Sequence, residues 1–152
     1  MLPYPFEYIS KAKELLAIKG KGTSLEDMTN IQTLDQALAV RALIQIINTS
    51  KAIEESKEPA KVNDNELFSR MKLEMIKAHI EYLSFYLFLD KVKKTELKDD
   101  RIKPILMDLY RIAALNSLRE DSGSVFESEY FAPTANKNMK LALDALISKV
   151  RP

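Results

Sequence analysis

The chain has 152 residues, 46% of them hydrophobic and 30% charged, which suits a single globular domain with one buried core. Its 23 basic residues nearly balance 22 acidic ones, so we expect no nucleic-acid partner, and the lack of cysteine excludes disulfides, thiolate metal sites and cysteine nucleophiles. No apolar run approaches the ~20 residues of a membrane helix, so we expect no membrane span.

Apolar residues recur at helical spacing along most of the sequence, which contains only three glycines. This pattern predicts an all-α domain, 1–152, built as a mostly antiparallel bundle of about five helices. A short peripheral helix should begin after Pro5 and end at Gly20, where glycine accepts the left-handed conformation. The second should run from Thr33 to about Glu55, with Thr33 and Gln36 as a capping box.

The third helix is predicted over 66–94, roughly 40 Å long, with Asn63 and Asp64 as N-cap candidates after the polar connector 57–65. It carries two apolar stripes, which predict a central helix buried on two sides. The first stripe comprises Leu67, Met71, Met75, Ala78, Tyr82, Phe85 and Leu89, and the second Leu73, Ile76, Ile80, Leu83 and Leu87.

The fourth helix should follow the charged connector 93–101, with Pro104 in its first turn, where a missing amide proton does little harm. An aromatic-rich turn or short helix is expected before Pro133, and the last helix should begin near Asn136. The predicted core stripe of the fourth helix comprises Ile102, Ile105, Leu106, Leu109, Ile112 and Ala113.

Catalytic motifs are missing from the sequence. Three scattered glycines allow no phosphate-binding loop, dinucleotide turn or nucleophile elbow. The single histidine, His79, has Ile76 and Met75 before it where a di-metal bundle would need a glutamate, so we expect no metal site. We therefore assign no catalytic residue to this chain.

Three polar residues fall on faces that should be buried. We interpret His79 as a core histidine hydrogen-bonded to a neighbouring helix, with ligand contact as the alternative. Lys72 should extend its amine to solvent or pair with a carboxylate rather than act as a base. Arg41 should form a buried or interfacial ion pair rather than bind an anion.

Several segments resemble the C-terminal helical domain of acyl-CoA oxidases. These are Leu109–Leu115 (LYRIAAL), Leu118–Phe126 (LREDSGSVF) and Glu129–Phe131 (EYF), with Leu38–Ala42 (LAVRA) and Lys149–Pro152 (KVRP) in agreement. In the family, a similar helix leads into an acidic-Gly-Phe turn and a Gly-Tyr-Leu-like step. Here Ser122 and Glu129 stand where the pattern has a leucine and a glycine.

The resemblance implies a fragment of a larger peroxisomal flavoenzyme that converts acyl-CoA to trans-2-enoyl-CoA and passes electrons from FAD to O2, giving hydrogen peroxide. The proton-abstracting glutamate and a Gly-Gly-His-Gly stretch near the flavin belong to an earlier domain, and nothing here matches them. The implied partners are the remaining domains of the same chain, a second subunit in a homodimer, and acyl-CoA in the full-length protein. FAD is then expected in the full-length protein and not in this fragment.

Two alternative hypotheses remain open. The chain could be a free-standing helical module that binds an amphipathic partner helix in a groove. It could also be a carrier that holds a small molecule between its helices. We interpret the apolar residues near the two ends of the chain, Leu2, Tyr4, Phe6 and Val150, as surfaces that meet missing parts of a longer protein.

Overall fold

The computed structural model describes residues 6–56, 66–96, 99 and 101–151, and these residues form helices without a β-strand. The all-α prediction is therefore confirmed. Four long helices correspond to the predicted ones, and four short helices accompany them. The helices are α1 Glu7–Ser10, α2 Ala12–Ala17, α3 Leu25–Thr29, α4 Ile31–Glu54, α5 Glu66–Lys94, α6 Ile102–Glu120, α7 Gly123–Glu127 and α8 Ala135–Val150.

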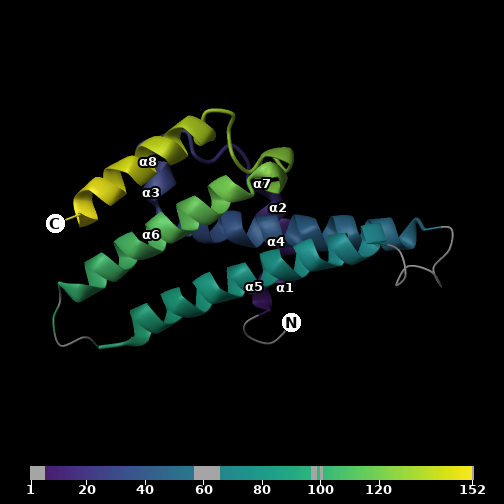
Figure 1. Cartoon of the computed structure of the whole chain (residues 1–152), viewed down its shortest axis with the longest axis horizontal. Helices are drawn as coiled ribbons and strands as arrows, with labels where there is room; N and C mark the ends of the chain where they lie inside the picture. Colours follow the sequence, from purple (N-terminus) through teal and green to yellow (C-terminus); the bar gives the residue numbers. More distant parts are fainter. Residues whose placement is uncertain (1–5, 57–65, 97–98, 100, 152) are drawn as a thin grey trace.

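The long helices alternate in direction along the chain (Figure 1). Helix α5 runs back along α4, with which it makes the most extensive contact between described helices. Helix α6 returns beside them, and α8 runs back alongside α6. This arrangement is the predicted antiparallel bundle. None of the helices in the described ranges is long and apolar enough to cross a membrane.

The predicted start of the second helix was wrong by about one turn. The side chain of Asn30, not Thr33, caps α4, because its Oδ1 accepts hydrogen bonds from the backbone amides of Gln32 at 2.8 Å and Thr33 at 3.3 Å. The Thr33 hydroxyl instead donates to Asp27 of α3, a helix that the sequence pattern did not predict. The cap candidates Asn63 and Asp64, like Leu2 and Tyr4, lie outside the described residues.

The first predicted helix is divided at Lys11 into α1 and α2, and α2 ends at Ala17, three residues before Gly20. Gly20 and Gly22 both have positive φ, 70° and 80°, in a segment that pairs with residues 129–132. A Cβ at Gly22 would lie 2.6 Å from the Cβ of Ala135, so this crossing requires glycine. Lys21 forms an isolated bridge to Phe131 there.

The core fills the space between α4, the inner faces of α5 and α6, and α8. Leu34, Leu38 and Val40 on α4 are fully buried, as are Leu115 and Leu118 on α6. Met139 and Ala142 of α8 close it, so the regular apolar spacing of the last helix does face the core.

Helix α5 spans the predicted residues, but only one of its apolar stripes is buried. Ala78, Tyr82 and Leu89 of the first stripe face the core. The second stripe is largely exposed, and Leu73 and Ile80 keep 66% and 56% of their surface. The prediction of burial on two sides was wrong for this chain because none of its described helices covers that face.

The predicted core stripe of α6 was wrong for most of its residues, although Ile112 is half-buried against the core. Ile102, Ile105 and Leu109 are exposed, and the helix instead buries Tyr110, Ala114, Leu115, Leu118 and Asp108. Both faces of α6 carry apolar residues, so periodicity alone cannot tell which of them meets α4 and α8. Pro104 does lie in the first turn, as predicted.

Candidate functional site

Arg41 joins three helices through a polar cluster in the core. Its side chain is 1% exposed, and Nη2 donates to Oε2 of Glu81 on α5 at 2.6 Å. Nη1 donates to the backbone carbonyl of Ser117 on α6 at 2.9 Å, and Nη2 also reaches the Ser117 hydroxyl at 3.0 Å. The hydroxyl of Ser117 donates in turn to Glu81 at 3.2 Å.

This cluster is a structural ion pair. The guanidinium lies in the last turn of α6, where the helix dipole favours a cation, and the Ser117 carbonyl that it contacts also accepts the backbone amide of Asp121 at 3.3 Å. Its charge is neutralised by Glu81, and its two terminal nitrogens are occupied by α5 and α6. The geometry matches the ion-pair interpretation of Arg41 and leaves no terminal nitrogen directed at an external anion.

His79 is held by the first helix. The hydroxyl of Tyr8 forms a hydrogen bond with Nδ1 of His79, and the ring of Phe6 stacks on the imidazole with centroids 5.4 Å apart. Burial lowers the pKa of His79 and raises that of Tyr8 to about 12, so both groups stay neutral at physiological pH. The hydrogen bond to a neighbouring helix is the structural role expected of His79, and it docks α1 on α5.

Lys72 is half-buried, seven residues before His79 on α5. The two side chains therefore lie on the same side of the helix, roughly 10 Å apart along its axis. The structure does not bring Arg41, Lys72 and His79 together into one site, since Arg41 meets α5 at Glu81, on a different side of the helix.

Two carboxyl groups, of the buried Asp108 and the half-buried Asp35, were not singled out from the sequence. The carboxylate of Asp108 on α6 forms two ion pairs, with Nη1 of Arg111 at 2.8 Å and with Nζ of Lys149 on α8 at 2.6 Å. The second ion pair links the last helix to α6. Asp35 on α4 has a buried Oδ1 without a hydrogen-bond partner, and burial raises the pKa of its carboxyl to about 6 although Lys93 opposes the change. Neither residue belongs to a motif, so only the fold identifies them.

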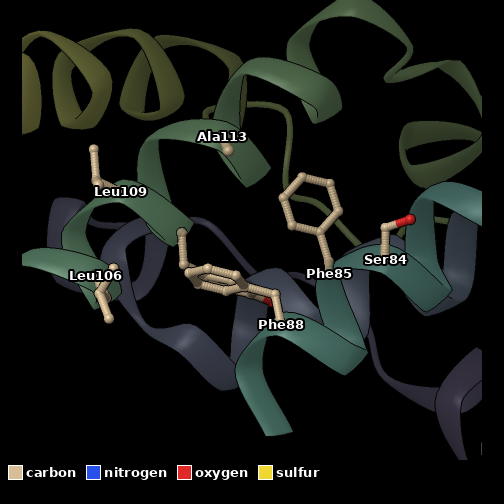
Figure 2. Close-up of a pocket in the computed structure, with 7 residues that line it drawn as sticks. Ser84, Phe85, Phe88, Leu106, Leu109 and Ala113 are labelled. Carbon is tan, nitrogen blue, oxygen red and sulfur yellow. The ribbon is translucent and has the colours of Figure 1, made fainter. Parts of the chain in front are cut away.

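An apolar groove opens between α5 and α6 (Figure 2). Its volume is about 330 Å³, and Figure 2 shows Phe85 and Phe88 on one wall and Leu106, Leu109 and Ala113 on the other. Ser84 and Tyr110 complete the lining. Since no charged group lines it, the pyrophosphate of FAD or the phosphates of coenzyme A would have no ionic partner there.

Exposed apolar residues are also concentrated on the two helices that form the groove. Eleven large hydrophobic side chains are exposed among the described residues, and five of them lie on α5 and three on α6. Those on α5 and α6 are Leu73, Ile76, Ile80, Leu87, Phe88, Ile102, Ile105 and Leu109. Exposed apolar area of this extent marks an interaction surface. It is the feature that sequence reasoning missed, because it assigned most of these residues to the core.

The described residues contain no group of three His, Asp or Glu side chains that could hold a metal ion. Nor do the contacts described above place a nucleophile beside a base. The arrangement is suited to packing and association.

Comparison with known proteins gives a consistent result. A family model described as acyl-CoA oxidase matches residues 30–152. Acyl-CoA oxidase 1 of Arabidopsis thaliana superposes with a TM-score of 0.87 at 22% identity over 100% of this chain and 23% of that one. An acyl-CoA oxidase of tomato (Lycopersicon esculentum) gives a TM-score of 0.84 at 18% identity over 95% of this chain and 22% of its own. At these identities the structures show a common fold, and this chain spans less than a quarter of their length. No curated protein sequence matches it.

Proposed function

Because this chain belongs to the acyl-CoA oxidase family, we propose that it is the second, C-terminal helical domain of an FAD-dependent acyl-CoA oxidase. The full-length enzyme would remove two hydrogens from the α and β carbons of a fatty acyl-CoA, giving the trans-2-enoyl-CoA. Reduced FAD would pass its electrons to O2 and form hydrogen peroxide. This reaction would be the first step of fatty-acid β-oxidation in the peroxisome.

In this proposal the domain has a structural role, and other domains of the enzyme provide the catalytic base and bind the flavin. It packs on the flavin-bearing domain and supports a homodimer. The observation that carries this role is the exposed apolar surface of α5 and α6 on a domain whose own core is filled. The proposal is also supported by length, since the chain covers only 23% and 22% of the two similar oxidases.

The test is a peroxide assay on two proteins. This chain, supplied with FAD and a range of acyl-CoAs, should produce no hydrogen peroxide, because neither a base nor a flavin cradle is provided by its residues. The longer polypeptide of the native transcript should bind flavin and produce peroxide. Turnover by the short chain would refute the proposed division of roles.

A second candidate is favoured by the exposed stripe of α5, which would also suit a free-standing module that binds an amphipathic helix. The native transcript distinguishes the two. If no Gly-Gly-His-containing helical region and no acyl-CoA dehydrogenase-like β-domain precede this segment, the oxidase proposal fails.

A further inference from the structure

The side chains of this domain that can lose a single electron are mainly phenols. The sequence contains no cysteine and no tryptophan but six tyrosines. Thiolates, indoles and phenols are the protein groups that give up one electron most readily, so in this chain that reaction falls on the tyrosines. The oxidase reaction proposed above makes hydrogen peroxide, whose one-electron reduction yields a radical oxidant. The surroundings of each phenol then decide which tyrosine is oxidised.

Tyr8 has a base hydrogen-bonded to its phenol. Its hydroxyl forms a hydrogen bond with Nδ1 of His79, which joins α1 to α5. Removing an electron from a neutral phenol leaves a radical cation that is a very strong acid. Loss of the electron is therefore much easier when a neighbouring base takes the phenolic proton at the same moment.

Both partners have the protonation state that this transfer needs. Burial raises the pKa of Tyr8 to about 12, so the phenol keeps its proton, and burial lowers the pKa of His79, so the imidazole is neutral. A phenol is a better donor than acceptor, whereas an unprotonated imidazole nitrogen is a strong acceptor. We therefore place the bridging proton on Tyr8 and the imidazole's own proton on Nε2.

Two other buried phenols lack such a base. The hydroxyl of Tyr130 donates to the backbone carbonyl of Thr33 at 2.8 Å and lies 3.4 Å from Oε1 of Gln36, and neither oxygen takes up a proton at neutral pH. The hydroxyl of Tyr110 is buried without a hydrogen-bond partner. Oxidation of either ring would leave an unpaired positive charge in apolar surroundings, which is unfavourable.

Stacked rings give electrons a path to Tyr8, which is itself only 4% exposed. The ring centroid of Tyr8 lies 4.4 Å from that of Tyr82, and the centroid of Tyr82 lies 5.9 Å from that of Tyr86. Tyr82 is buried, whereas Tyr86 is half-buried and within reach of an oxidant in solvent. An electron taken from Tyr86 can be replaced through Tyr82 from Tyr8, because adjoining aromatic rings exchange electrons rapidly.

We propose that Tyr8 and His79 form a proton-coupled redox pair on which one-electron oxidation of this domain is collected. The O–H bond of Tyr8 breaks, its proton forms an N–H bond with Nδ1 of His79, and one electron passes to a radical oxidant, which is reduced. The products are a neutral tyrosyl radical and an imidazolium ion. The inference goes beyond the proposed function, which supplies only the peroxide from which the oxidant forms.

The experiment exposes this chain to azide radicals made by pulse radiolysis, which oxidise tyrosine by one electron. One dominant tyrosyl radical should appear in the optical and EPR spectra, and its spectrum should be lost in Tyr8→Phe. The matched control is Tyr110→Phe, which removes a hydroxyl without a partner and should leave the spectrum unchanged. A dominant spectrum that survives in Tyr8→Phe would overturn the proposal.

The role of His79 is tested by a variant that keeps an acceptor but removes the base. His79→Asn places an amide oxygen near the position of Nδ1 and should slow formation of the Tyr8 radical about a hundredfold, a typical effect of a positioned base. Formation at the parent's rate would refute proton transfer to His79.

Two measurements on the parent need no variant, so they decide the question even if a substitution undocks α1. Formation of the radical should be slower in heavy water, because the proton moves with the electron, and equal rates in the two solvents would overturn the proposal. Nitrogen NMR should show a proton on Nε2 of His79 and none on Nδ1. A proton on Nδ1 would refute it. None of these measurements uses flavin or acyl-CoA, so their outcome is independent of the proposed function.

Discussion

At the scale of single residues, Asp35 is the side chain with the most unusual environment. One carboxylate oxygen is buried without a partner, and its negative charge adds to the effect of burial in raising the pKa values of Tyr82, Tyr110 and Tyr130. Lys93 is the nearby cation that favours ionisation. Burial outweighs it, so the pKa of Asp35 is raised from 3.8 to about 6. The folded domain therefore holds a proton on Asp35 more tightly than the unfolded chain does.

This has a defined effect on stability. The contribution of protonated Asp35 is fully present below pH ~4 and is lost as the pH rises through about 6, at a cost of at most about 3 kcal/mol. The variant Asp35→Asn, which is neutral at every pH, should be more stable than the parent near pH ~8 and nearly equal to it near pH ~4. Urea unfolding at both pH values measures this. An equal difference at the two pH values would show that ionisation of Asp35 is not responsible.

The structure explains how Glu129 can replace the glycine of the family pattern. Its φ is 58°, in the left-handed region that favours glycine, at the position where the family pattern has a glycine. Its carbonyl accepts the hydrogen bond from the Gly20 amide at 3.0 Å, which fixes the backbone there. The side chain is largely exposed, so glutamate is accommodated at the cost of backbone strain alone.

At the scale of elements, the Arg41 cluster connects α4, α5 and α6 in a way that apolar packing cannot. Leucines and alanines along these helices would tolerate small shifts of one helix past another. A guanidinium that reaches Glu81 and Ser117 at once fixes the rotation of both neighbours. The sequence placed Arg41 on a buried face, but its partners lie 40 and 76 residues away and could not be inferred.

The variant Arg41→Met should lower the free energy of unfolding by about 3 kcal/mol, because it leaves the Glu81 carboxylate without its cation while the Ser117 hydroxyl still donates to it. Glu81 is one-third exposed, so water recovers part of the loss. The double variant Arg41→Met/Glu81→Leu should regain some stability by removing the orphaned charge. Chemical unfolding of the parent, both single variants and the double variant gives the coupling. An Arg41→Met variant within about 0.5 kcal/mol of the parent would contradict this role.

At the scale of the whole molecule, the domain has a well-filled apolar core and a surface on which many large apolar side chains are exposed. Exposed apolar residues are concentrated on α5 and α6, next to a groove that carries no charge. Such a groove can accept an apolar chain but offers nothing to the phosphates of coenzyme A. On this chemistry we expect the groove to contact apolar protein side chains rather than an acyl-CoA.

Accordingly, acyl-CoAs of any chain length should leave the melting temperature of this chain unchanged. A ligand present at 100 times its dissociation constant would stabilise the fold by about 2.7 kcal/mol, which a thermal-shift measurement readily detects. Free coenzyme A serves as the control for effects of the head group. A shift that grows with acyl-chain length and is absent with coenzyme A alone would favour the carrier hypothesis instead.

The sequence by itself determined the helical class, the antiparallel order and the extent of α5, because long glycine-poor stretches with apolar residues at helical spacing allow little else. It could not determine which apolar stripe of α5 and α6 is buried. Both stripes satisfy the same periodicity, and the choice depends on which surface a distant helix happens to cover. Only the tertiary structure determined which stripe is buried. It also determined that Arg41 pairs with Glu81 and that Oδ1 of Asp35 is buried without a hydrogen-bond partner. The stripes that it left exposed have the spacing of core residues, and the proposed packing of this domain on other protein rests on them.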